Sequence, residues 1–202
     1  MGLKHSYTIL SPIYDLIVSA PTKKLRRQSL HRLNQHDTQQ VLINGIGSGF
    51  DIPHLPKGPQ YTATDLTPAM LSRAHKRAQA SDVNIELKQA DSMDLPFAND
   101  TFDIVVMHLI LAVVTDPISA LQEAQRVTKT GGKIFIIDKF LRPRQLAPLR
   151  RLLSPMLRHV ATNTNVVFED LHKQCPQLKL IDDQPALLAG WFRSIELEKQ
   201  AH

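Results

Sequence analysis

The chain alternates short apolar runs with longer segments whose apolar residues recur at helical spacing. Strands are predicted where an apolar run is continuous or every second residue is apolar, over 41–45, 61–65, 84–89, 102–107 and 133–138. Helices are predicted over 68–80, where Thr67-Pro68 supplies an N-cap and a first turn, and over 116–127. Alternating strands and helices predict an α/β domain with a parallel core sheet.

The two ends of the chain differ from this core. Helices are predicted over 6–19 and 22–34, divided by Pro21, and Gly131-Gly132 is predicted to end the helix that begins at Asp116-Pro117. Beyond the core the pattern predicts two helical regions and an antiparallel pair of strands, over 142–160, 163–174, 178–181 and 188–197. We interpret 1–202 as a single domain, because the length leaves little room for a second.

Composition narrows the class of protein. The chain has 202 residues, of which 43% are hydrophobic and 21% charged, as is ordinary for a globular protein. Its single cysteine, Cys175, excludes an intrachain disulfide, and the histidines show no metal-ligand spacing, so we expect no metal. No apolar run approaches the roughly 20 residues that span a bilayer, and the N-terminus lacks a signal-peptide pattern. We therefore expect a cytoplasmic protein.

The formal net charge of +5 is concentrated in two segments. Their basic residues are Lys23, Lys24, Arg26, Arg27, Arg32, Arg142, Arg144, Arg150, Arg151 and Arg158. Such clusters suggest an anionic partner, unless they are simply solvated helix faces. Leucines recur at helical intervals over 146–157, which is typical of a helix at a membrane interface or of one packed on the core. The first alternative would place the protein peripherally at the inner membrane face.

A glycine turn follows the first predicted strand. Gly45, Gly47 and Gly49 remove every Cβ from one side of the turn, so a ligand can approach the backbone closely. Such a turn at the carboxyl end of a parallel strand is where nucleotides bind in open α/β sheets. Phe50 stands where a dinucleotide fingerprint requires its last glycine, which favours S-adenosylmethionine over NAD.

Carboxylates end the next two strands. Asp65 follows the second strand, where it could accept hydrogen bonds from a ribose diol, and Asp91 follows the third, where it could accept from the adenine amine. Each also has a plainer interpretation, because Asp65 could cap the following helix and Asp91 could begin a turn. In this order after the glycine turn, the two together indicate a nucleotide-like cofactor.

These segments resemble class I S-adenosylmethionine-dependent methyltransferases, above all the group that methylates ubiquinone precursors and bacterial phosphatidylethanolamine. The resemblance covers nearly the whole chain and rests on Ser6-Tyr7 to Tyr14-Asp15, Val41 to Gly49, Asp65 to Leu71, Asp91 to Phe97, Phe102 to Val105, His108, Asp116-Pro117, Glu123, Arg126-Val127 and Lys129 to Lys133. Thr130 is a mild departure, because the family usually has proline there. The resemblance implies an α/β, Rossmann-like, doubly wound, mostly parallel seven-stranded sheet with an antiparallel C-terminal strand. It divides the domain into an N-terminal helical lid (1–36), a cofactor-binding core (41–140) and a basic helix with a C-terminal hairpin (141–202).

By this resemblance the cofactor is S-adenosylmethionine and the acceptor is a small hydrophobic molecule or a lipid. The glycines would pass under the methionine moiety, Asp65 would hold the ribose, Asp91 would take the adenine amine, and residues after the fourth strand would line the cavity near the methyl group. The implied cofactor-binding residues are Gly45, Gly47, Gly49, Asp65, Leu66, Asp91, Ser92, Met93, Met107 and His108.

The candidate bases or orienting groups are His108, Tyr14, Tyr7 and Asp15. His108 follows a buried strand, where its imidazole could titrate near neutrality or merely form the pocket wall. Tyr14 and Asp15 fall on the N-terminal helix, which in related enzymes closes over the active site, and they could instead pack on its surface. An amine acceptor need only arrive neutral, whereas a phenol or an enol-like carbon needs a base.

Ile43 departs from the family, which usually places an acid two residues before the first glycine. An isoleucine cannot accept a hydrogen bond from the cofactor's ammonium group, and Asn44 should point to the other side of the sheet. Either another group compensates, or affinity is weakened, or the site is repurposed, unless isoleucine is simply a good strand residue. The alternative function is therefore the same fold with altered or lost methyl transfer, acting as a cofactor-binding or regulatory module. Nucleic-acid methylation is less favoured, because no recognition module is appended.

Overall fold

The computed structural model describes residues 22–33, 39–141, 166–187 and 190–201. A helix over 22–30 comes first. The later elements are β1 (Gln40–Asn44), η1 (Ile52–His54), β2 (Gln60–Asp65), α2 (Pro68–Gln79), β3 (Ile85–Gln89), β4 (Phe102–His108), α3 (Pro117–Val127), β5 (Thr128–Lys139), α5 (Phe168–His172), β6 (Leu178–Leu187) and β7 (Phe192–Lys199).

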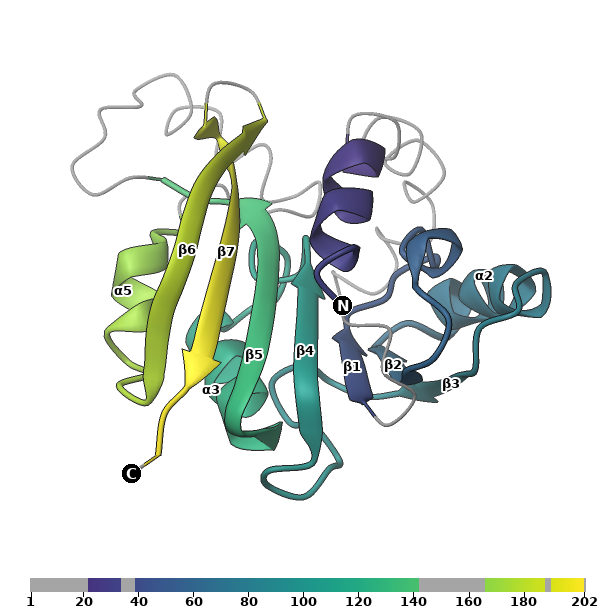
Figure 1. The fold of residues 1–202 in the computed structure, drawn as a ribbon, viewed down its shortest axis with the longest axis horizontal. Helices are drawn as coiled ribbons and strands as arrows, with labels where there is room; N and C mark the ends of the chain where they lie inside the picture. Colours follow the sequence, from purple (N-terminus) through teal and green to yellow (C-terminus); the bar gives the residue numbers. More distant parts are fainter. Residues whose placement is uncertain (1–21, 34–38, 142–165, 188–189, 202) are drawn as a thin grey trace.

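The strands form one seven-stranded sheet in the order β3-β2-β1-β4-β5-β7-β6 (Figure 1). β1 to β5 pair in parallel, and β7 lies antiparallel to both β5 and β6. This arrangement confirms the fold predicted from the sequence. The chain order reverses between β1 and β4, so the carboxyl ends of these strands open the crevice in which α/β sheets bind ligands.

Two apolar cores lie on opposite faces of the sheet because strand side chains alternate between faces. On one face, Leu42 of β1 joins buried residues of α3 and α5. On the other, Val41 and Ile43 join the helix at 22–30 and α2. The helices thus cover both faces, as the doubly wound prediction requires (Figure 1).

β5 begins earlier than predicted. The sequence Lys129 to Gly132 was expected to separate helix from strand, but α3 ends at Val127 and β5 starts at Thr128. Gly131-Gly132 therefore does not end the helix. It lies in β5, where the register against β4 shifts between Phe102 and Ile104. A Cβ on Gly132 would come within 2.8 Å of the Asp103 carbonyl oxygen, which explains the need for glycine there.

The C-terminal strands also differ from their predicted bounds. β6 continues to Leu187 through two aspartates and Pro185. An edge strand tolerates charges and proline, because one side of its backbone needs no partner. The helix predicted over 163–174 corresponds to α5 within the described part, and the helices predicted over 6–19 and 142–160 lie outside the described residues.

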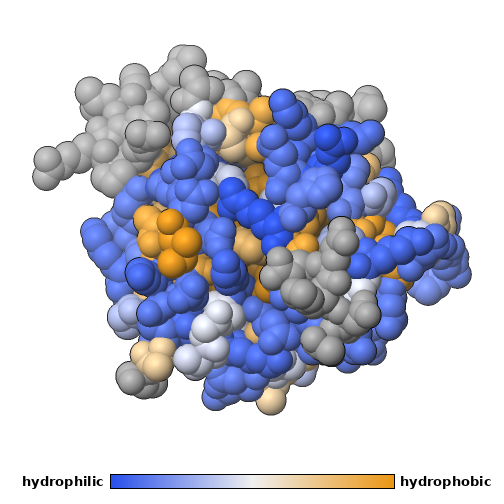
Figure 2. All heavy atoms as spheres, in the orientation of Figure 1, coloured by the Kyte–Doolittle hydropathy of each residue, from blue (hydrophilic) through white to orange (hydrophobic). Residues whose placement is uncertain are grey.

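The visible surface is largely hydrophilic, with a small apolar patch on the side of β6 and β7 (Figure 2). Leu180 and Ile181 of β6 are 40% and 44% exposed. Within the described ranges, no helix is both long enough and apolar enough to cross a bilayer.

Candidate functional site

The glycine turn has the left-handed backbone that its sequence predicted. The φ angles of Gly45, Gly47 and Gly49 are 79°, 57° and 89°, a region that L side chains disfavour. The three glycines serve different purposes. A Cβ on Gly49 would meet the Ala74 backbone at 2.9 Å, and one on Gly45 would meet the Ile110 side chain at 2.6 Å. A Cβ on Gly47 would meet no atom of the described residues within 4 Å, so in this part of the chain Gly47 leaves open space above the turn.

Asp65 joins the end of β2 to this turn. Its Oδ2 accepts a hydrogen bond of 2.9 Å from the Gly47 amide, and its Oδ1 accepts one of 2.8 Å from the Thr67 amide. Burial raises the pKa of Asp65, and the two amides oppose that rise. Each carboxylate oxygen keeps a further lone pair. The amides therefore orient the carboxylate without preventing it from accepting from a diol.

Asp91 begins the turn after β3. Its Oδ1 accepts a hydrogen bond of 2.9 Å from the Met93 amide, so the plainer interpretation of Asp91 also holds. The buried Ser92 hydroxyl donates to Asn44 Oδ1 at 2.7 Å. The loop beyond is braced from α3, where Glu123 accepts from the Leu95 amide at 2.7 Å. The turn is thus fixed both from β1 and from α3.

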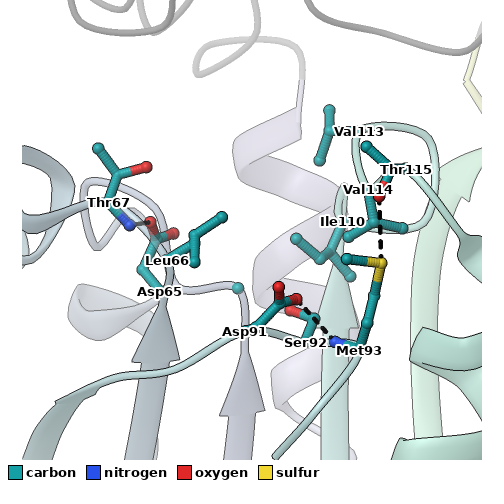
Figure 3. A pocket seen from close by; sticks show the side chains of 11 residues that line it. Asp65, Leu66, Thr67, Asp91, Ser92, Met93, Ile110, Val113, Val114 and Thr115 are labelled. Carbon is teal, nitrogen blue, oxygen red and sulfur yellow. Dashed lines mark hydrogen bonds between the residues drawn. The ribbon is translucent and has the colours of Figure 1, made fainter. Parts of the chain in front are cut away.

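A pocket opens between these strand ends (Figure 3). Asp65 lies at one end of it with Leu66 and Thr67, and Asp91 lies beside Met93, toward the apolar side chains of Ile110, Val113 and Val114. The lining residues are Gly45, Asp65, Leu66, Thr67, Asp91, Ser92, Met93, Ile110, Val113, Val114 and Thr115. Sequence reasoning missed Thr67, which it placed only as a helix N-cap, and the last four residues, which follow β4. Their position after a buried parallel strand was the available signal, because ligand sites gather at such ends.

His108 and Met107 lie away from this lining. Met107 is fully buried in the core shared with α3 and α5. His108 is 3% exposed, and both of its ring nitrogens are engaged, Nδ1 with Asp51 Oδ1 at 2.9 Å and Nε2 with Ser29 Oγ at 3.0 Å. Its imidazole therefore joins β4 to the helix at 22–30 instead of facing the pocket. Tyr7, Tyr14 and Asp15 lie outside the described residues.

Asp51 is the centre of a buried charged group that sequence reasoning missed. Arg26 Nη1 donates to the same Oδ1 at 2.8 Å, and Asp51 is 1% exposed. Burial alone would raise the pKa of Asp51, but the charge of Arg26 and the contact with His108 hold it far below its ordinary value. We call Arg26, Ser29, Asp51 and His108 the buried polar group.

Ile43 lies inside the protein on the face covered by the helix at 22–30. It is fully buried in one apolar cluster with Leu30 and Leu33. Asn44 points to the opposite face, as strand alternation predicted, and contacts Ser92 and Thr64. Ile43 is thus a core residue that does not line the pocket.

The pocket suits S-adenosylmethionine. Gly45 of the glycine turn, the oriented Asp65 and the apolar side chains beside Asp91 fit a methionine chain, a ribose diol and an adenine, whereas Gly47 and Gly49 are not among the lining residues of the described pocket. No group of three or more potential metal ligands occurs in the part of the chain that the structure describes.

Comparison with known proteins agrees with this geometry. Residues 42–136 match the family model of a methyltransferase domain. These matches support an S-adenosylmethionine-dependent methyltransferase, with S-adenosylmethionine as its cofactor.

The chain is similar to methyltransferases of known name. The chain is 26% identical to a phosphatidylethanolamine N-methyltransferase of Cereibacter sphaeroides, over 93% of each chain. It is 39% identical over 79 residues to the ubiquinone/menaquinone biosynthesis C-methyltransferase UbiE of Roseobacter denitrificans, which covers 38% of this chain and 32% of that one.

Solved structures share the fold at low sequence identity. The [4+2]-cyclase SpnF has a TM-score of 0.76 and 14% identity, over 98% of this chain and 95% of that one. The geranyl diphosphate C-methyltransferase of Streptomyces coelicolor A3(2) has a TM-score of 0.72 and 14% identity, over 88% and 80%. The names of these two proteins show that the fold serves more than one reaction.

Proposed function

We propose that this methyltransferase transfers the methyl group to a lipid-like amine, of the phosphatidylethanolamine type, at an anionic membrane surface. The similarity to a phosphatidylethanolamine N-methyltransferase over almost the whole of both chains supports an acceptor of this class. A quinone precursor is the second candidate, supported by the shorter match to UbiE.

The observation that carries the proposal is the two-sided helix at 22–30 with the turn that follows it. Its outer face exposes Lys23, Lys24 and Arg27, with His31 in the turn, and residues 22–33 contain no acid. Its inner face is tied through Arg26 and Ser29 to the buried polar group at the end of β4. A basic face anchored to the sheet that carries the site is suited to bind an anionic surface.

The described pocket residues favour an amine over a carbon or phenol acceptor. Asp65 and Asp91 are the ionisable side chains of the pocket lining in the described part of the chain. On this proposal, both hold the cofactor and neither is left to act as a base. Attack by a neutral amine needs no base to remove a proton first, whereas a phenol or an enol-like carbon does. His108, the one candidate base that lies among the described residues, has both ring nitrogens occupied.

The residues of the chain perform binding, orientation and exclusion of water. When bound, S-adenosylmethionine supplies an activated methyl group for in-line displacement. Asp65 and Asp91 hold its adenosine end by hydrogen bonds. The apolar side chains of Ile110, Val113 and Val114 would exclude water from the pocket beside the adenine.

A vesicle experiment tests the surface and the acceptor together. The protein is sedimented with phosphatidylglycerol vesicles, and methyl transfer from labelled cofactor is measured with vesicles that carry either phosphatidylethanolamine or a demethylated quinone. We expect binding at low salt, loss of binding in the triple variant Lys23→Gln, Lys24→Gln, Arg27→Gln, and label in the amine lipid.

The matched control replaces three exposed lysines elsewhere, Lys57, Lys76 and Lys173, by glutamine, which removes the same charge. Equal loss in both triple variants would show general charge attraction instead of a specific face. Label in the quinone alone would replace the amine acceptor with the second candidate.

The competing function is a cofactor-binding module without methyl transfer. It is favoured because this chain has Ile43 where the family usually has an acid. It predicts that S-adenosylmethionine and S-adenosylhomocysteine bind while no acceptor is labelled. Calorimetry with both compounds, run beside the vesicle assay, separates this function from the proposed one.

A further inference from the structure

Asn44 joins the ends of the strands that hold the cofactor. It is the last residue of β1 and is fully buried. Its Oδ1 accepts from the Ser92 hydroxyl at 2.7 Å and from the Thr64 hydroxyl at 3.3 Å. Each of the three residues stands beside a residue of the site, since Asn44 precedes Gly45, Thr64 precedes Asp65 and Ser92 follows Asp91.

This polar contact stands where an apolar side chain would pack. Leu42, two residues earlier on the same face, belongs to the core. Among the described residues, Asn44 Nδ2 has no hydrogen-bond partner although it is buried. An amide that is only partly satisfied contributes less to stability than a well-packed leucine would. Stability therefore does not account for Asn44, whereas its contact with the pocket residue Ser92 does.

We propose that Asn44 is a positioning residue for the adenine end of the cofactor site. Through Ser92 it fixes the turn in which the Asp91 carboxylate and the Met93 backbone meet the base. Without the Asn44 carbonyl, the Ser92 hydroxyl has no acceptor at this place, and the turn loses its attachment to β1. The turn would then be held only from α3 among the contacts described above, where Glu123 accepts a hydrogen bond from the Leu95 amide.

Base selectivity distinguishes positioning from general stabilisation. Calorimetry measures the affinity for S-adenosylhomocysteine and for S-inosylhomocysteine, in which a carbonyl replaces the adenine amine that Asp91 would accept from. We expect Asn44→Leu and Ser92→Ala each to weaken binding of the adenosyl compound about tenfold, as loss of one buried hydrogen bond does. We also expect each variant to bind S-adenosylhomocysteine with a smaller preference over S-inosylhomocysteine than the natural protein shows. The double variant should lose little more than either single one, because both remove the same contact.

Thr128→Val is the matched control. Its buried hydroxyl donates to the Ala124 carbonyl at 2.6 Å at the start of β5, away from the pocket. It should lower thermal stability and leave affinity and base preference unchanged. Ser92→Ala keeps the test valid should Asn44→Leu fail to fold. Unchanged affinity and preference in Ser92→Ala and Asn44→Leu would overturn the proposal. No acceptor is present, so the result is independent of the proposed lipid amine.

Discussion

Asp51 Oδ1 and His108 Nδ1 are joined by a hydrogen bond of 2.9 Å inside the protein, although 57 residues separate them in sequence. Asp51 follows the glycine turn and His108 ends β4. Because Arg26 and Ser29 complete this buried polar group, the helix at 22–30 is attached to both the turn and the sheet. The seating of the helix and the shape of the turn are therefore linked.

Replacing Asp51 with asparagine should destabilise the protein by about 3 kcal/mol, because it leaves the Arg26 charge buried without its partner. The free energy of unfolding from urea denaturation measures this. The control is Asp82→Asn, which breaks the exposed pair of Asp82 with Lys57. We expect no measurable change there, since exposed ion pairs contribute little. If Asp51→Asn were as stable as the natural protein, the Arg26 charge would not depend on the Asp51 carboxylate for its stabilisation.

The same carboxylate predicts a particular pH dependence. The pKa of Asp51 lies below its ordinary value of 3.8, despite burial, because of Arg26 and His108. Its contribution is therefore present above about pH 4 and is lost as the pH falls through the folded pKa. The stability difference between the natural protein and Asp51→Asn should narrow as the pH drops from about 5 to 3. Urea denaturation across this range measures the difference.

Two other buried carboxylates change the stability with pH in the opposite direction, so their effects must be distinguished from that of Asp51. Burial raises the pKa of Asp65 and Asp138, so their contributions are greatest below the unfolded pKa and fall as the pH rises through the folded pKa. Both groups are present in the natural protein and in the variant, and their effects cancel in the difference. A difference that widened on acidification would contradict the assignment to Asp51.

The sequence predicted the sheet well, and it predicted the residues at the strand ends that line the pocket, because both depend on local patterns. Alternation of apolar residues fixed the strands, and Gly45, Asp65 and Asp91 follow directly from strand ends. The buried polar group could not be predicted in this way. Arg26, Asp51 and His108 are far apart in sequence, and a charged side chain on a helix is ordinarily solvated. Only the packing of the helix at 22–30 against β4 brings them together.

The role of His108 illustrates the same limit. The family resemblance placed it near the methyl group because it follows β4. Strand alternation instead directs it to the face where Val106 contributes to the core, under the helix at 22–30. The pocket wall begins two residues later, at Ile110.

Two alanine substitutions in the glycine turn should separate cofactor binding from stability. Gly47→Ala places a Cβ in open space, so its stability cost is limited to about 1–2 kcal/mol of left-handed backbone strain. That Cβ would occupy the space needed by the cofactor, and calorimetry should show S-adenosylhomocysteine binding weakened at least about tenfold.

Gly49→Ala should instead act on folding. Its Cβ would lie 2.9 Å from the Ala74 backbone, which adds overpacking to the same strain. We expect a loss of about 3 kcal/mol in the free energy of unfolding. If Gly47→Ala bound the cofactor normally, the cofactor would not pass over that part of the turn.

Substitutions at Ile43 test whether this chain lacks the cofactor contact that an acid at this position usually makes in the family. The side chain is fully buried among Leu30, Leu33 and other apolar residues, and does not line the pocket. Ile43→Asp would place a carboxylate there without a partner, so we expect it to destabilise the protein by roughly 4 kcal/mol and not to strengthen cofactor binding. Ile43→Val, which removes one methylene from the same position, should cost about 1 kcal/mol and leave binding unchanged. Urea denaturation and calorimetry with S-adenosylmethionine measure the two effects separately. Tighter binding by a folded Ile43→Asp would mean that the position faces the cofactor after all, and that isoleucine there weakens the natural site.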